Sequence, residues 1–137
     1  MVTSGSNDSL DNAENKILEF EILNSLKDFI GSEPFGQYLS EYLNNTLSNI
    51  DRLGHAIAAE DDDRVKQFSH KLKGSAGNIG ALKLSSVCSK MQDLSLEDEQ
   101  PGNLKNLFQE IQRIYNETRD ELNVYINQLA QMKRNVG

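Results

Sequence analysis

Apolar residues recur every three or four positions along most of this chain, a spacing typical of helices that bury one face. The spacing runs through successive segments, which we expect to be helices at about residues 10–30, 35–59, 63–79, 83–94 and 104–132. No segment alternates apolar and polar residues between turn signals, as a half-buried strand would. Short connections between amphipathic helices favour antiparallel neighbours. The pattern therefore predicts an all-α fold, an antiparallel up-down four-helix bundle with an additional N-terminal helix.

Particular residues indicate where these helices begin and end. Gly31 and Gly80 are expected to end the first and third helices, because glycine adopts the left-handed conformation that closes a helix. The acidic tract 61–63 is expected to cap the start of the third helix, where negative charge complements the macrodipole. Pro34 and Pro101 fall in the expected connections.

The length of 137 residues predicts one domain, at residues 10–134, after a leader or linker stub at 1–9. The single cysteine, Cys88, excludes a disulfide framework and is predicted to be a buried thiol. No apolar run approaches the roughly 20 residues that span a bilayer, and the N-terminus has no signal-peptide core. We expect a monomeric cytoplasmic protein without membrane insertion, or a cytoplasmic piece of a larger one.

The net charge of −7 argues against a nucleic-acid partner. The charge is unevenly distributed, however. Between residues 64 and 90 there are six basic residues and no acidic ones: Arg64, Lys66, Lys71, Lys73, Lys83 and Lys90. A basic face on an acidic body suits an acidic protein partner or a phosphoryl group.

The most informative stretch is residues 68–81. A buried helical stripe is predicted at Val65, Phe68, Leu72, Ala76 and Ile79. His70 lies about 150° from the centre of this stripe, so its side chain is expected to face solvent. Gly74 and Gly77 follow one and two turns along the same face. A glycine inside a helix costs about 1 kcal/mol relative to alanine, so the pattern indicates that something docks beside His70.

The segment from His70 to Gln92 resembles the histidine-containing phosphotransfer (HPt) domain of multistep two-component signalling. The family pattern is His-x-Leu-Lys-Gly and a small residue, then a Gly-Ala-like break and a second helix. Here it reads His-Lys-Leu-Lys-Gly-Ser at 70–75, Gly-Ala at 80–81, and a helix to Gln92. The resemblance implies a phosphocarrier that relays a phosphoryl group between receiver-domain aspartates, and not an enzyme.

The resemblance also implies roles for individual residues. His70 would accept the phosphoryl group, Lys73 would offset its charge, and Gln92 would hydrogen-bond the imidazole. Gly74 would keep the surface open for the receiver domain. The surrounding binding surface is expected to comprise an apolar patch beside His70 together with Lys66, Lys71 and Gly77.

The resemblance also implies the partners, which are receiver domains of a hybrid sensor kinase, of a response regulator, or of both. No cofactor or metal is expected on this chain, and the Mg²⁺ that transfer needs would come from the receiver domain.

Two other interpretations compete with this one. A dimerising autokinase would carry a His-Glu/Asp-x-x-Pro-like motif, but Lys71 follows His70 and no proline is near. A helical adaptor with the same fold but no phosphotransfer remains the alternative. His55 lacks the surrounding glycines and lysines and is expected to have no special role. Whether the chain is free-standing or the end of a hybrid sensor kinase stays open.

Overall fold

The computed structural model describes residues 15–94 and 101–136 as a bundle of helices, without strands in those ranges. The helices are α2 (Phe20–Ile30), α3 (Ser32–Ala58), α4 (Asp62–Asn78), α5 (Leu82–Asp93) and α6 (Pro101–Val136). The all-α bundle with an additional N-terminal helix is thereby confirmed. Within the described ranges, no helix is both long and apolar enough to cross a membrane. The expected leader, residues 1–9, lies outside the described residues.

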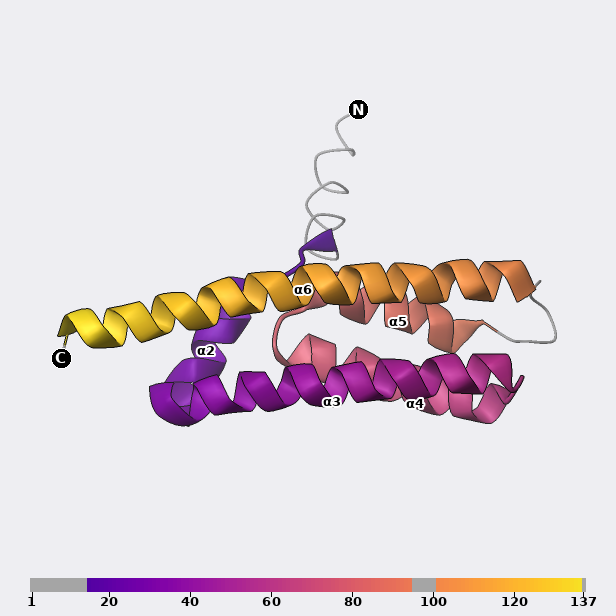
Figure 1. Ribbon diagram of the computed structural model, residues 1–137, viewed down its shortest axis with the longest axis horizontal. Helices are drawn as coiled ribbons and strands as arrows, with labels where there is room; N and C mark the ends of the chain where they lie inside the picture. Colours follow the sequence, from indigo (N-terminus) through magenta and orange to yellow (C-terminus); the bar gives the residue numbers. More distant parts are fainter. Residues whose placement is uncertain (1–14, 95–100, 137) are drawn as a thin grey trace, which may run out of the picture.

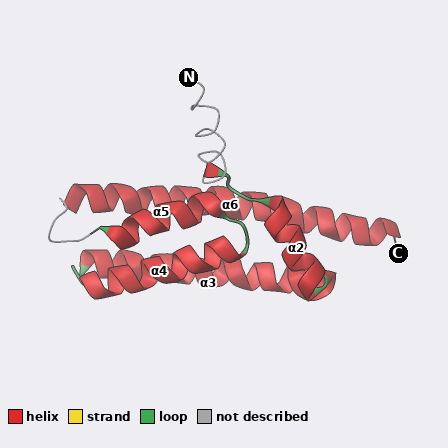
Figure 2. Cartoon of the chain, turned by 180° about the vertical axis from the view of Figure 1, so that it is seen from behind, coloured by secondary structure: helices red, strands yellow, loops and turns green. Residues whose placement is uncertain are grey.

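The four long helices form a closed ring. α4 packs against α3 and α5, and α6 packs against the same two helices from the other side. Figure 1 shows the result, with α3 and α4 in one layer and α5 and α6 in the other. α4 and α6 are therefore diagonal to each other. The shorter α2 packs beside the beginning of α3, and Figure 2 shows it from the opposite side.

The core lies inside this ring, where the predicted apolar stripes meet. The fully buried large side chains include Leu23, Phe35, Leu39, Leu53, Leu72, Ile79, Leu84, Met91, Ile111, Ile114 and Leu122. Burying a side chain of this size stabilises the fold by about 2 kcal/mol. Cys88 is also fully buried, as predicted, and burial raises the pKa of its thiol to about 12.

The first helix was predicted wrongly at its beginning. It starts at Phe20 and not near residue 10, because Glu19 is extended and its carboxylate accepts a hydrogen bond from the N–H of Glu21. Residues 16–19 are not helical, and residues 10–14 lie outside the described part. Phe20, the first residue of this helix, is 47% exposed.

Both prolines lie in first turns of helices and not in connections as expected. Pro34 is the third residue of α3, and Pro101 is the first residue of α6. Backbone N–H groups in a first turn have no partner within the helix, so a residue without one is tolerated there.

The turn from α4 to α5 ends on Gly80, as predicted. Its φ of 82° lets the N–H of Gly80 bond the carbonyl of Gly77, and the N–H of Ala81 bond that of Ala76. These are the two hydrogen bonds of a Schellman motif. The motif reverses the chain over a few residues and so sets α5 antiparallel to α4.

The non-helical segment 16–19 binds this turn. The N–H of Glu19 donates to the carbonyl of Gly80 at 2.8 Å, and the N–H of Lys83 donates to the carbonyl of Lys16 at 2.8 Å. Leu18, which lies between Lys16 and Glu19 in the sequence, is buried. The segment therefore holds the closed end of the α4–α5 hairpin.

Candidate functional site

The candidate site lies on the outer face of α4. Asp61 caps this helix, its carboxylate accepting a hydrogen bond from the N–H of Arg64 at 3.2 Å. Ser69 and Leu72 precede and follow His70 in the sequence, and both are completely buried. Successive positions on a helix point about 100° apart, so both side chains point away from that of His70, which is exposed.

Gln92 lies across from His70, in the last turn of α5. Its side-chain Nε2 is 3.2 Å from Nδ1 of the imidazole. The hairpin that joins α4 to α5 therefore brings together two residues that are 22 positions apart. With Nδ1 occupied, Nε2 of the imidazole is the ring nitrogen left for a partner from solvent.

The orientation of the Gln92 amide decides which ring nitrogen carries the proton. If Gln92 Nε2 donates to Nδ1, the imidazole proton sits on its Nε2, and the amide oxygen Oε1 is buried without a partner among the described residues. If the amide turns by 180°, Oε1 accepts from Nδ1–H and the Nε2 lone pair of the imidazole is free. The amide oxygen and nitrogen are nearly equal in size, so the same space holds either orientation.

Lys73 and Gly74 follow on the same face, and both are exposed. A Cβ atom built on Gly74 would meet nothing within 4 Å outside its own helix. The surface one turn from His70 is therefore open. Of the residues expected around the histidine, Gly74 is the one whose surroundings leave room for an approaching surface.

Gly77 has a different environment from Gly74. It is half-buried and faces α5, where a Cβ atom would lie 3.6 Å from Oγ of Ser85. The same Ser85 hydroxyl donates to the carbonyl of Lys73 at 2.9 Å. Gly77 thus lies at the contact between α4 and α5, and not on the open outer face where the sequence placed it.

Ser85 was missed from the sequence. A small hydroxyl residue facing a helical glycine across a short turn is the signal that could have found it.

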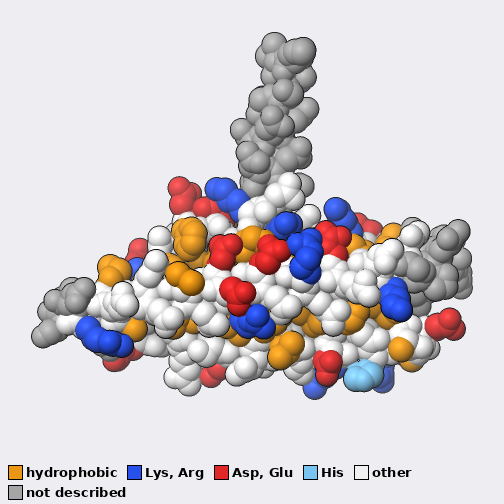
Figure 3. All heavy atoms as spheres, turned by 45° about the horizontal axis from the view of Figure 1, so that its top comes forward, with side chains coloured by type: hydrophobic (Ala, Val, Ile, Leu, Met, Phe, Trp, Pro, Cys, Tyr) orange, Lys and Arg blue, Asp and Glu red, His pale blue; other side chains and the backbone are white. Residues whose placement is uncertain are grey.

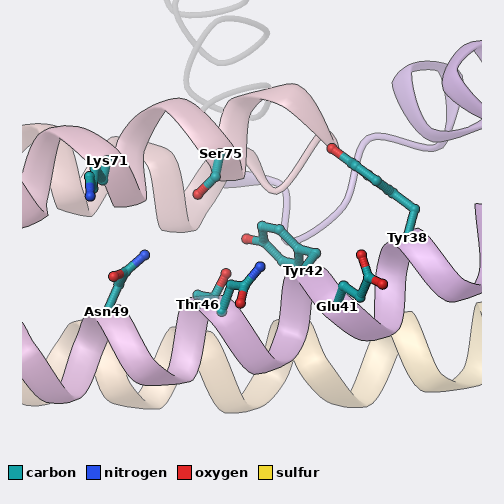
Figure 4. A pocket seen from close by; sticks show the side chains of 8 residues that line it. Tyr38, Glu41, Tyr42, Thr46, Asn49, Lys71 and Ser75 are labelled. Atoms are coloured by element: carbon teal, nitrogen blue, oxygen red, sulfur yellow. The ribbon is translucent and has the colours of Figure 1, made fainter.

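The two other lysines expected at the site make their side-chain contacts with residues other than His70. Lys66 forms an ion pair with Asp62 one turn earlier in α4, with an N–O distance of 3.6 Å. Lys71 turns toward α3, and its Nζ lies 6.0 Å from the centre of the Phe68 ring. A groove of about 330 Å³ lies between α3 and α4 at this point. Figure 4 shows Lys71 and Ser75 on α4 facing α3 across it.

The apolar patch expected beside His70 is not found there. The large apolar side chains that are exposed in the described ranges lie on α2, α3 and α6: Phe20, Phe29, Leu47, Val124 and Met132. On α4, Phe68 is half-buried and packs against the core. In the same ranges, no three His, Cys, Asp or Glu side chains cluster as a metal site would need.

Fold and site together define a helical-bundle domain that presents one histidine to solvent beside an amide from the next helix. A sequence model of the Hpt domain matches residues 37–132, which is most of the chain. The chain therefore belongs to the Hpt domain family. This match includes every residue that we expected at the site.

Two individual proteins are similar to this chain. The sensor protein TorS of Escherichia coli (strain K12) is 25% identical over 84 residues, which are 61% of this chain and 9% of TorS. The chain thus spans about a tenth of the length of that relative. The crystal structure of histidine-containing phosphotransfer protein B (HptB) from Pseudomonas aeruginosa PAO1 superposes with a TM-score of 0.71. That match is 20% identical and covers 82% of this chain and 96% of HptB, and it shows the shared fold.

Proposed function

We propose that this domain is a phosphorelay intermediate in which His70 carries the phosphoryl group. Membership of the Hpt family gives the class of function, histidine phosphotransfer. The observation that carries the assignment to His70 is its exposed imidazole with Gln92 at Nδ1 and an open surface at Gly74. His55 is also exposed but has no comparable contact in the described part of the chain.

The transfer follows from the geometry of the imidazole. With the Gln92 amide in its turned orientation, Oε1 accepts from Nδ1–H, and the lone pair on Nε2 of His70 points to solvent. This lone pair attacks phosphorus in an aspartyl phosphate, an N–P bond forms, and the P–O bond to the aspartate breaks. The aspartate leaves as a carboxylate, and the ring keeps its Nδ1 proton against the amide oxygen. In the reverse step, an aspartate carboxylate attacks phosphorus and the imidazole nitrogen leaves.

The surrounding residues provide positioning and charge, which are the main protein contributions to phosphoryl transfer. Lys73 lies one turn from His70 and offsets part of the negative charge on the phosphoryl oxygens. Gly74 lets the receiver surface approach in line with Nε2. The Mg²⁺ for the reaction would be held by the acidic pocket of the receiver domain.

The expected partners are receiver domains, which would supply the aspartates on both sides of the relay. We propose that the domain acts as a phosphocarrier and does not phosphorylate itself from ATP. A helical adaptor with the same fold but without transfer is the competing function.

Phosphotransfer in vitro tests this proposal. The chain is incubated with Mg²⁺ and a ³²P-labelled receiver domain, beside the variants His70→Gln and His55→Gln and a reaction with ATP alone. His55→Gln is the matched control, because it removes an exposed imidazole from α3. We expect acid-labile, base-stable label on the wild type and on His55→Gln, and none on His70→Gln.

Each other outcome has a definite meaning. Label on His70→Gln would place the phosphoryl group elsewhere and overturn the assignment. Label from ATP alone would show an autokinase. Absence of label with several receivers, from a protein whose circular dichroism is helical, would favour the adaptor.

A further inference from the structure

A second surface lies between α2 and α6. It is a hollow of about 270 Å³, lined by Phe20 of α2 and by residues of α6: Asp120, Glu121, Val124, Tyr125 and Gln128. Two apolar side chains at this hollow are unusually accessible, because Phe20 is 47% exposed and Val124 is 56% exposed. Large apolar side chains that a fold leaves accessible beside a hollow are typical of interaction sites.

The floor of the hollow is a set of packed aromatic rings. The Phe20 ring lies against Tyr125 with centroids 5.8 Å apart, and Tyr125 meets Phe35 edge-on at 6.1 Å. The Tyr125 hydroxyl donates to Oδ1 of Asn24 at 2.6 Å. Because these contacts fix the rings, the surface needs little reorganisation to bind a partner.

The rim of the hollow is acidic. Glu121 makes no ion pair within the described ranges. Asp120 forms an ion pair with Arg119, with an N–O distance of 3.1 Å. Burial raises the pKa of the Tyr125 phenol, and the negative charge of Asp28 on α2 adds to the effect. Figure 3 shows apolar and acidic side chains side by side over the half of the molecule that contains the C-terminal end of α6, with some basic side chains among them.

This surface is far from His70 in the ring of helices. His70 faces outward on α4, whereas Val124 faces outward on α6, and α4 and α6 are diagonal. A partner on α2 and α6 therefore leaves the exposed imidazole accessible.

We propose that the α2–α6 hollow is a docking site for a basic amphipathic segment of a partner protein. An apolar side chain of the partner would fill the space between Phe20 and Val124. A lysine or arginine one helical turn away would pair with Glu121. Charge complementarity selects this occupant, because an acidic surface repels anionic membranes and segments of its own sign. The partner could stay bound while His70 exchanges its phosphoryl group.

Binding of a model peptide tests the proposal on the full chain. The probe is an amphipathic helical peptide of Leu, Lys and Ala, and its control has Glu in place of every Lys. The ¹⁵N-labelled protein is titrated with each peptide, and amide shifts are mapped by NMR. Sedimentation velocity of the free protein measures self-association.

The variants are Val124→Ser and Glu121→Lys, with Leu47→Ser as the matched control. Leu47 is 55% exposed on α3 and lies outside the hollow. We expect the basic peptide to shift amides of α2 and α6 around residues 20 and 120–128, and the acidic peptide to have no effect. Each α6 variant should weaken binding about tenfold, and Leu47→Ser should leave it unchanged. Phosphotransfer to Val124→Ser should proceed at the wild-type rate, which separates this surface from the function proposed for His70.

Other results would overturn the proposal. Absence of binding, or shifts that map to α3 and α4, would show that the hollow is not a docking site for basic segments. Equal binding by Glu121→Lys would remove the charge argument. A dimer in sedimentation that Val124→Ser dissociates would make a second copy of the chain the occupant.

Discussion

The side-chain Nε2 of Gln92 on α5 lies 3.2 Å from Nδ1 of His70 on α4, and this contact joins the two helices of the hairpin at the histidine. Replacing Gln92 with alanine removes the group that sets the ring proton. We expect a decrease of about tenfold in the single-turnover transfer rate, corresponding to about 1.4 kcal/mol for a hydrogen bond. The transfer rate is measured in quenched single-turnover reactions with a labelled receiver domain.

The stability of Gln92→Ala should stay close to wild type, because in either amide orientation only one polar atom of the Gln92 side chain bonds the imidazole and the other is buried without a partner in the described structure. Imidazole ¹⁵N shifts should show a changed tautomer balance. A wild-type rate in Gln92→Ala would contradict a positioning role.

Gly74 has open space where a side chain would project. Gly74→Ala should therefore raise the free energy of unfolding by about 0.5–1 kcal/mol, because alanine loses less backbone entropy in a helix. Gly74→Gln should stay folded but transfer more slowly, because its side chain would cover the surface beside His70. Urea denaturation and single-turnover transfer measure the two effects.

Gly36 provides the control for Gly74. It lies in α3 and likewise has nothing within 4 Å of a built Cβ atom. Gly36→Gln should leave transfer unchanged. If the two glutamine variants transfer equally fast, Gly74 is not part of the docking surface.

Gly80 combines a positive φ with a close contact. A Cβ atom there would lie 2.7 Å from the backbone oxygen of Glu19, and the φ of 82° is unfavourable for alanine. Gly80→Ala should cost more than about 2 kcal/mol of stability, because strain and displacement of the segment 16–19 add together.

Gly31→Ala is the comparison for Gly80→Ala in urea denaturation. Gly31 also has a positive φ, of 101°, but its nearest neighbours are Pro34 atoms at 3.7 Å. Gly31 also has a ψ of 149°, a region that only glycine adopts readily, so its loss reports backbone strain without a close contact. Amide exchange of Glu19 and Lys83 should accelerate in Gly80→Ala and not in Gly31→Ala, and equal exchange in the two variants would mean that the Glu19 contact is unimportant.

Glu60 closes α3 with a φ of 55°, in the left-handed region. Its N–H bonds the carbonyl of Ile57, and the N–H of Asp61 bonds that of Ala56, as in the turn at Gly80. Glu60→Gly should raise the free energy of unfolding by up to about 1 kcal/mol, and with it the melting temperature, because glycine adopts this conformation without strain. Glu60→Ala keeps the strain and should show no gain; a gain of the same size there would refute the explanation.

Cys88 gives a pH dependence. Burial raises its pKa from 9.0 to about 12 in the folded protein. A raised folded-state pKa means that the buried thiol stabilises the fold fully below pH 9. The contribution is lost as the pH rises toward 12, because the unfolded chain releases the proton first. The free energy of unfolding should fall more steeply above pH 9 in the wild type than in Cys88→Ala. Identical slopes in urea denaturation at pH 8, 9 and 10 would show that the thiol titrates normally.

The periodic pattern predicted the helices and most of the core, because burial of one face is written directly into residue spacing. Leu72, Ala76 and Ile79, for example, are completely buried as expected. The beginnings of the helices were harder to predict from the sequence, because they depend on tertiary contacts. The segment at Lys16 and Glu19 is not helical, and its backbone bonds the α4–α5 turn instead.

The site was predictable as a set of positions on one helix, but their neighbours were not. Spacing alone gives the angle of Lys71 or Gly77 from His70, and it does not say which helix lies on that side. α3 turned out to lie beside Lys71 and α5 beside Gly77. The resemblance suggested Gln92. Ser85 was not predicted, because its contact with Gly77 depends on how closely α5 approaches α4.

The diagonal arrangement of α4 and α6 has a consequence for how such domains diverge. Their outer faces share no side chains, so substitutions on one face are selected independently of those on the other. The sequence around His70 would be constrained by the phosphotransfer that we propose for it. Substitutions on the exposed face of α6 would then alter the proposed docking surface without changing the surroundings of the histidine.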